Sequence, residues 1–309
     1  MRNETVYDVA IVGGGPAGLS AAVWLGRYLR SVVLVDSGDP RNWEARGING
    51  FLGLPRVTPQ ELRAIGREEA RRYGARLVDG EVTTARREEE ERFRLELRDG
   101  GTALARRVLL AIGIKDVWPD IPGLEPCYGD TVHHCPDCDG HEARGCRTVV
   151  VASGRKAVGM ALDLTTWTRE IIICTNGAAP DISAEHLAKL DALDIPVLTE
   201  PIARAVHRDG VLQALALRNG LQLDCERLFF AFGHYPADDL GVQLGCERDD
   251  EGLIVIDAHY HTSVYGVYAA GDIVPGPHLA IAAASDGAMA ALSMHRGLVP
   301  GERKLEVGG

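Results

Sequence analysis

The chain has 309 residues, enough for two domains that each bury a core. Hydrophobic residues make up 46% and charged residues 25%, as in an ordinary soluble globular protein. The 33 basic and 44 acidic residues give a formal net charge of −11, which argues against binding to nucleic acid or an anionic membrane surface. No stretch is apolar for long enough to span a membrane, and residues 1–8 are charged and lack the apolar core of a signal peptide. We therefore expect no membrane association and a cytoplasmic location.

The first predicted unit consists of a strand, a glycine-rich turn, a helix and a second strand. Residues 6–12 form a short apolar run of the kind seen in buried parallel strands. Pro16 suits the first turn of a helix over residues 17–28, because its missing N–H is not needed there. Residues 32–36 read as the next strand. This order predicts a βαβ unit.

The turn of this unit carries the spacing Gly13-x-Gly15-x-x-Gly18, a dinucleotide-binding fingerprint in its required context. Gly13 permits the tight turn, Gly15 lets a pyrophosphate approach the backbone, and Gly18 lets the helix pack closely on the strand. The helix N-terminus offers free N–H groups to the phosphates. Asp36 ends the second strand, where its carboxylate can accept a hydrogen bond from a ribose hydroxyl.

The middle of the first half alternates between apolar and charged residues. Residues 81–107 have this period of two, with a turn at 99–101, and the seven consecutive charges of residues 86–92 predict a solvated hairpin tip. Residues 108–112 read as a strand that ends at Gly113, and residues 118–123 read as a linker.

A second βαβ unit follows, with a strand at 148–152, a helix at 157–167 and a strand at 170–174. Later elements are predicted from the same patterns: turns at 208–210 and 219–220, strands at 228–232, 253–257 and 266–270, and a helix at 279–295. The fold class is therefore α/β, with two Rossmann-like nucleotide-binding domains of the three-layer ββα type, the second inserted into the first. We expect the outer domain at 1–115 and 241–309 and the inner domain at 116–240.

Two of the seven cysteines form a close pair, Cys135-Pro136-Asp137-Cys138. In such a pair the second sulfur can resolve a mixed disulfide formed by the first, so a redox role is favoured. The alternatives are an inert pair and a zinc site completed by His133, His134 or His141, although ligands from so short a segment would strain a tetrahedral shell. We therefore expect no metal. The other five cysteines are expected to pack as small buried hydrophobic residues.

The chain resembles the low-molecular-weight thioredoxin reductases. The resemblance spans nearly the whole sequence and rests on four motifs in the order found in that family: 13–18 (GGGPAG), 111–113 (AIG), 135–140 (CPDCDG) and 269–272 (AAGD). It implies a homodimer that binds FAD in its outer domain and reduces a disulfide, such as that of thioredoxin.

The resemblance also implies a set of FAD-binding residues. In it Arg41 lies near the pyrophosphate, Asp272 contacts the ribityl–phosphate region, Val82 meets the adenine through its backbone, and the helix beginning near Ala280 points at the isoalloxazine ring. The full set is Gly13, Gly15, Pro16, Ala17, Gly18, Asp36, Ser37, Arg41, Asn42, Val82, Ala111, Gly113, Gly271, Asp272, His278, Leu279 and Ala280. For His278, a helix N-terminal polar residue is an equally good interpretation.

Catalytic roles follow from the same resemblance. Cys138 would face the flavin, Cys135 would exchange with the substrate, and Asp139 would act as acid and base for the departing thiolate.

The inner nucleotide site departs from the family pattern. Ala152 replaces the first glycine of its turn, and residues 174–181 contain no basic side chain where the family has arginines for a 2′-phosphate. Arg155 and Lys156 could compensate only from another direction. We therefore expect a donor other than NADPH, such as a ferredoxin or one not yet known.

Two further functions are consistent with this pattern. One is a flavin-dependent dithiol oxidase that passes electrons to oxygen, and the other is a non-catalytic flavoprotein redox sensor. Asp139 follows the reductase pattern, since the oxidases usually have histidine there, whereas residues 39–42 (DPRN) resemble the divergent branches.

Overall fold

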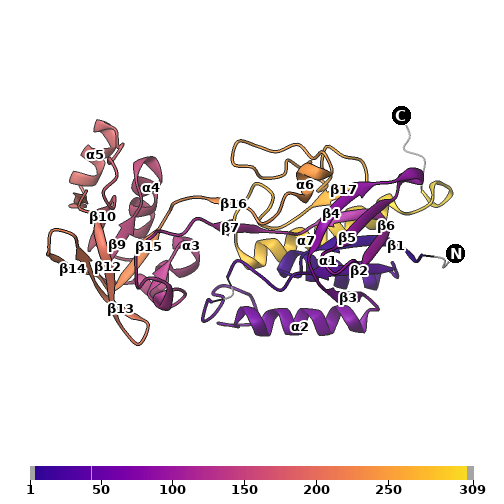
Figure 1. The fold of residues 1–309 in the computed structure, drawn as a ribbon, viewed down its shortest axis with the longest axis horizontal. Helices are drawn as coiled ribbons and strands as arrows, with labels where there is room; N and C mark the ends of the chain where they lie inside the picture. Colours follow the sequence, from indigo (N-terminus) through magenta and orange to yellow (C-terminus); the bar gives the residue numbers. More distant parts are fainter. Residues whose placement is uncertain (1–3, 43, 305–309) are drawn as a thin grey trace.

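A computed structural model describes residues 4–42 and 44–304 of the chain; the remaining ends of the predicted outer domain lie outside the described residues. Figure 1 shows two lobes joined by a pair of extended segments. The first lobe is built on a sheet in the order β3-β2-β1-β6-β5-β4, with β17 paired to β6. Its strands are β1 (Val6–Val12), β2 (Val32–Asp36), β3 (Arg76–Asp79), β4 (Val82–Arg87), β5 (Phe93–Leu97), β6 (Thr102–Leu110) and β17 (Val267–Ala269). Strand β1 is parallel to its neighbours β2 and β6, and β6 is parallel to β17. Strands β4, β5 and β6 form an antiparallel meander.

Helices cover one face of this sheet (Figure 1). They are α1 (Pro16–Arg27), α2 (Pro59–Arg72) and α7 (Ala280–Gly297); short helical turns are α6 (Leu240–Gln243), η1 (Glu89–Glu91) and η4 (Gly301–Arg303). Pro16 begins α1 as expected. Helix α2 begins with a capping box in which Thr58 and Glu61 bind each other's backbone N–H groups. Gly287 of α7 lies directly against α1, since a Cβ there would stand 1.9 Å from the carbonyl oxygen of Ala17.

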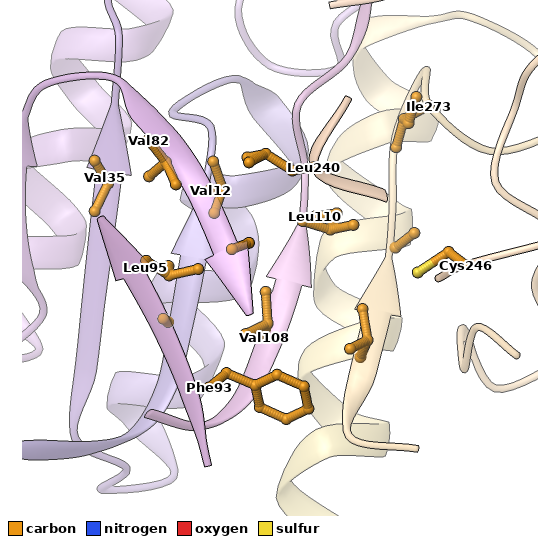
Figure 2. Close-up of a cluster of buried hydrophobic side chains, with 14 of the residues drawn as sticks. Val12, Val35, Val82, Phe93, Leu95, Val108, Leu110, Leu240, Cys246 and Ile273 are labelled. Atoms are coloured by element: carbon orange, nitrogen blue, oxygen red, sulfur yellow. The ribbon is translucent and has the colours of Figure 1, made fainter. Parts of the chain in front are cut away.

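The other face of the sheet buries a second apolar layer, shown in Figure 2. Alternate residues of the strands point into it, among them Val12, Val35, Leu95 and Leu110, and Phe93 fills its lower edge. This period-two burial is the pattern predicted from the sequence of the meander.

The second lobe has a parallel sheet in the order β11-β10-β9-β15-β8. Its strands are β8 (Val132–His133), β9 (Thr148–Val151), β10 (Ile171–Cys174), β11 (Val197–Leu198) and β15 (Arg227–Phe230). An antiparallel sheet packs beside it, made of β12 (Ile202–Arg208), β13 (Val211–Leu217) and β14 (Gln222–Asp224). The helices are α3 (Pro136–Asp139), α4 (Gly154–Leu164) and α5 (Ala184–Asp191), with turns η2 (Glu125–Cys127) and η3 (Gly140–Ala143).

The chain crosses between the lobes twice, through β7 (Ile114–Asp116) and β16 (His234–Pro236). These strands pair antiparallel, with Asp116 opposite His234. The predicted fold class is confirmed, because the second Rossmann-like unit is inserted between β6 and β17 of the first. The domain boundaries at 115/116 and 240/241 stay predictions.

Some element predictions were wrong. Residues 253–257 form no strand, because Ile254 donates to Ile273 and Val255 donates to Glu247, so no continuous ladder develops beyond the bridge to Arg248. The sequence suggested that an alternating segment ends at residue 107 and that a separate strand begins at residue 108. Instead, β6 runs unbroken through this point and pairs with β5 at one end and β17 at the other. Helices α2 and α5 were not predicted.

Two helical glycines give a matched test of the α1–α7 contact. We expect Gly287→Ala to lower the free energy of unfolding by about 1–3 kcal/mol, because its Cβ would overlap the α1 backbone. Gly159→Ala in α4 is the control; its Cβ would meet nothing within 4 Å, so we expect a gain of about 0.5–1 kcal/mol. Urea unfolding of both variants measures the difference, and equal effects would contradict the packing argument.

Candidate active site

One cavity brings together the four sequence motifs. Most of the predicted site residues line it: Gly13, Gly15, Pro16, Ala17, Asp36, Ser37, Arg41, Asn42, Ala111, Gly113, Cys135, Cys138, Asp139, Gly271, Asp272, His278, Leu279 and Ala280. Two predicted residues are not among its lining residues. Gly18 packs under the turn, and Val82 is buried in the layer of Figure 2. The cavity therefore lies where β1, β6 and β17 end and extends to the redox pair of the second lobe.

The glycine-rich turn is shaped for a ligand. At Gly13, φ is +104° and a Cβ would lie 2.2 Å from the carbonyl oxygen of Ala111. Gly18 has a similar constraint, with its Cβ position 1.9 Å from the carbonyl oxygen of Gly13. At Gly15 a Cβ would meet nothing within 4 Å, so this position is open to the cavity. Helix α1 has no side-chain cap and no acidic residue in its first turn, which leaves its N-terminal N–H groups available for an anion.

Asp36 is held by partners that the sequence did not reveal. Its carboxylate accepts from the N–H groups of Gly14 and Gly38, both at 3.2 Å. Arg63 and Arg67, which lie one turn apart on α2, also donate to it, at 2.5 and 3.0 Å. Its contact with a ribose stays a prediction, and Arg63, which lines the cavity, adds a cation at this end.

Arg41 joins three segments that are distant in the sequence. Its guanidinium forms two hydrogen bonds to Asp116 of β7, at 2.6 and 2.7 Å, and one to Asp272 after β17, at 3.1 Å. Burial is the largest single influence and would raise the pKa of Asp116, but the hydrogen bond and the charge of Arg41, together with the neighbouring histidines, hold that pKa below its usual value. Two predicted cofactor residues, Arg41 and Asp272, are thus in direct contact.

Two histidine rings near Asp272 have unused polar atoms. The Nε2 atoms of His278 and His234 are buried and have no hydrogen-bond partner among the described residues. Their rings stand edge to face with centroids 5.3 Å apart. Burial lowers the pKa of His278. A buried unpaired nitrogen costs free energy, so the lining residue His278 is suited to bind a ligand group.

The cysteine pair forms a disulfide at the start of α3, with 5.3 Å between the Cα atoms. Cys135 occupies the N-cap position, and its sulfur accepts the N–H of Cys138 at 3.1 Å. Pro136 lies in the first helical turn, where its missing N–H costs no hydrogen bond. Both sulfurs belong to half-buried residues that line the cavity, so they are partly shielded from bulk water and open to a bound ligand.

Asp139 is oriented by both lobes. Asn49, in the loop after β2, donates its Nδ2 to Asp139 Oδ1 and to the carbonyl oxygen of Cys138, each at 3.2 Å. His133 of β8 places Nδ1 3.4 Å from Asp139 Oδ2. The acidic group predicted to serve the redox pair therefore has one partner from each side.

His134 forms a separate set of contacts. Tyr128 Oη lies 2.8 Å from His134 Nδ1, and His134 Nε2 lies 3.7 Å from Asp116 Oδ2. Burial lowers the pKa of His134 from 6.5 to about 4, so the ring is neutral at pH 7. Burial also raises the pKa of Tyr128, which keeps its hydroxyl protonated.

Sequence reasoning missed several lining residues, including Asn49, Arg63 and Tyr128. They lie in a loop, on an amphipathic helix and in a turn, and no local motif marks them. The histidines beside the cysteine pair were noticed only as candidate zinc ligands. Cys135 and Cys138 are instead joined to each other, and the described residues contain no group of three side chains suited to a metal ion.

The turn of the second nucleotide site, which we expect to be degenerate, has partners within its own domain. The N–H of Gly154, at the start of α4, donates to the carbonyl oxygen of Pro180 at 2.8 Å. The carboxylate of Asp181 lies at the same place, 3.7 Å from where a Gly154 Cβ would stand. Asn176, which follows β10, uses its side chain to accept the N–H of Ile202.

None of the helices in the described part of the chain is both long and apolar enough to cross a membrane.

Comparison with known proteins agrees with this architecture. The profile of the family described as pyridine nucleotide-disulphide oxidoreductase matches residues 7–287. A thioredoxin reductase of Mycolicibacterium smegmatis is 30% identical over 309 residues, 96% of this chain and 98% of that protein. The chain belongs to this oxidoreductase family, among relatives of the low-molecular-weight thioredoxin reductases.

Two solved structures superpose on nearly the whole chain. The crystal structure of HlmI is 34% identical, with a TM-score of 0.91 and coverage of 96% of this chain and 95% of that one. An oxidoreductase from Agrobacterium tumefaciens is also 34% identical, with a TM-score of 0.85 and coverage of 95% and 98%. The predicted family and enzyme class are thus confirmed.

The low pKa of His134 predicts a pH dependence of stability. Between pH 6.5 and 4 the unfolded chain binds a proton at this histidine that the folded chain does not, so the contribution is present above pH 6.5 and lost on acidification. We expect His134→Gln to reduce the slope of unfolding free energy against pH in this window, by up to about 1.4 kcal/mol per pH unit. Urea unfolding at several pH values measures both slopes, and identical slopes would contradict the assignment.

Proposed function

We propose that this protein is an FAD-dependent, thioredoxin-reductase-like disulfide oxidoreductase that uses Cys135 and Cys138 as its redox pair. The observation that carries the proposal is that this disulfide lines the same cavity as the dinucleotide fingerprint. The substrate we infer is a protein disulfide such as that of thioredoxin, as the name of the Mycolicibacterium smegmatis relative suggests.

The residues of the cavity fit FAD. The open position at Gly15 and the uncapped N-terminus of α1 suit a pyrophosphate, and Asp36 with Arg63 lies at the ribose end. Asp272 and the unpaired Nε2 of His278 lie at the end nearer the redox pair. When bound, FAD would supply two-electron chemistry beside the disulfide.

The redox pair itself performs thiol–disulfide exchange. In the reduced protein, the Cys135 thiolate would attack one sulfur of the substrate disulfide, and the first product thiolate would leave. Cys138 would then attack the sulfur of Cys135, which releases the second product thiolate and forms the Cys135–Cys138 disulfide again. Two electrons pass to the substrate, and each product thiolate takes up one proton, for which Asp139 is the proposed acid and base.

We further infer that NADPH is not the electron donor. Three features support this: the Gly154 N–H is already bound to Pro180, the carboxylate of Asp181 would repel a pyrophosphate, and residues 174–181 have no basic side chain. A reduced ferredoxin or another donor would have to deliver electrons by a route other than this site.

An anaerobic donor screen tests this inference. We expect dithionite-reduced ferredoxin or a small dithiol to bleach the visible absorbance of the holoenzyme, whereas NADPH and NADH leave it unchanged over the same time. The holoenzyme of a thioredoxin reductase that reacts with NADPH is the positive control. Rapid bleaching by NADPH would overturn the inference. Peroxide formation with a dithiol in air, without thioredoxin reduction, would identify a dithiol oxidase.

The redox pair is tested by Cys138→Ser. This variant can form a mixed disulfide through Cys135 but cannot resolve it, so we expect turnover with thioredoxin to fall on the order of 10³-fold or more. Cys146→Ser is the matched control, because Cys146 is a free, half-buried thiol that does not line the cavity. Full activity of Cys138→Ser would exclude the relay.

A further inference from the structure

Asp139 has a buried histidine partner on the strand that leads into the redox pair. His133 ends β8, and its side chain is 3% exposed. Its Nδ1 lies 3.4 Å from Asp139 Oδ2, and its Nε2 lies 3.1 Å from the carbonyl oxygen of Asp130. The ring also packs against Phe229, with centroids 5.2 Å apart. Both ring nitrogens therefore meet oxygen atoms inside the protein.

These two contacts constrain where protons can lie on the ring and on the carboxyl group. A backbone carbonyl can only accept, so His133 Nε2 must carry a proton and donate it to Asp130. Nδ1 then faces Asp139 Oδ2, and two unprotonated acceptors would repel each other at this distance. A proton held at the 3.4 Å ion-pair distance between Nδ1 and Oδ2 would lie either on the ring beside a carboxylate or on the carboxyl group beside a neutral ring.

Asn49 accounts for the other carboxyl oxygen. Its Nδ2 donates to Asp139 Oδ1 and also to the carbonyl oxygen of Cys138. Since Oδ1 is bound by the first lobe, Oδ2 is the oxygen that faces His133. This arrangement lies directly after Cys138 and opens on the cavity.

We propose that His133 and Asp139 act as a pair that holds one exchangeable proton for the thiols of Cys135 and Cys138. His133 is a positioning residue that acts through Asp139. The inference rests on the proposed function, because it assigns the proton transfers of the exchange described above.

The protons of the exchange balance in this scheme. When the first substrate S–S bond breaks, the pair gives its proton to the departing product thiolate. Cys138 then passes its thiol proton to the pair and, as a thiolate, closes the Cys135–Cys138 bond. The second product thiolate takes a proton from the pair, and water restores the original state.

The pH dependence of thiol reactivity tests the pair. Holoenzyme is reduced with dithiothreitol without oxygen, freed of reductant, and alkylated with iodoacetamide over a range of pH. His133→Gln keeps a donor for Asp130 but cannot carry a proton, so Asp139 remains as an uncompensated carboxylate. We expect the midpoint for Cys138 alkylation to rise by about one pH unit. The added change Asp139→Asn removes that charge and should return the midpoint toward the wild-type value.

Exchange rates give a second readout. Single-turnover reduction of a small aromatic disulfide should slow equally in H133Q, D139N and the double variant, because the two residues act as one unit. His207→Gln is the control; this histidine lies on β12 and contacts Gly210, away from the cavity. A pH profile of H133Q that superimposes on wild type would overturn the proposal, as would a double variant whose slowing equals the product of the two single effects.

Two outcomes separate this inference from the proposed function. If Cys135 and Cys138 exchange with disulfides but H133Q behaves as wild type, only the histidine role fails. If the reduced pair does not exchange at all, the proposed function fails and takes this inference with it. Should H133Q not fold, ¹⁵N NMR of histidine-labelled holoenzyme decides, since D139N must change one Nδ1 signal from a protonated or shared state to a free acceptor. The absence of any such change overturns the proposal.

Discussion

The pairing of β7 with β16 joins the two lobes, and the site depends on it because residues of both lobes line the cavity. Where the chain leaves the first sheet and where it returns, three residues on each side pair antiparallel. Asp116 at the end of β7 also binds Arg41, whose guanidinium reaches Asp272 after β17. Backbone hydrogen bonds and a buried ion pair therefore act at the same point. Because the ion pair is only slightly exposed, loss of one partner would leave a costly unpaired charge.

Charge is compensated along the whole cavity. Arginines face Asp36 at one end, Arg41 lies between two carboxylates in the middle, and Asp139 is matched by His133 and Asn49 at the other end. The chain as a whole is acidic, yet this cavity is lined by paired charges and free backbone N–H groups. In such a lining the carboxylates are already paired with cations, so a polyanionic ligand can bind without meeting unpaired negative charge.

The sequence predicted the features that short motifs encode. The βαβ order, the glycine spacing and the cysteine spacing are local, and each imposes a local geometry that the structure has. Partners supplied by tertiary packing could not be read in this way. Arg63 and Arg67 are ordinary exposed-face residues in the sequence of α2, and only the packing of α2 beside β2 and β3 directs them to Asp36. The strand predicted from the apolar run at 253–257 does not form, because a buried segment becomes a strand only where a neighbouring strand is free to pair with it. The contact between His133 and Asp139 could not be predicted for a similar reason, since nothing near His133 in the sequence indicates that it is buried.

The two nucleotide-binding folds differ in how the N-terminus of the helix in their βαβ unit is bonded, α4 at Gly154 in the inner lobe and α1 in the outer lobe. At the start of α4 the Gly154 N–H already binds the carbonyl oxygen of Pro180, so this group has an internal partner whether or not a ligand is present. The start of α1 has no side-chain cap, and a ligand that binds only the folded state raises stability with the logarithm of its concentration relative to its dissociation constant. Removal of the ligand should therefore loosen the outer lobe first, while the lobe that carries the disulfide stays folded. The protein would then unfold in two steps, in an order set by which helix terminus lacks a partner of its own.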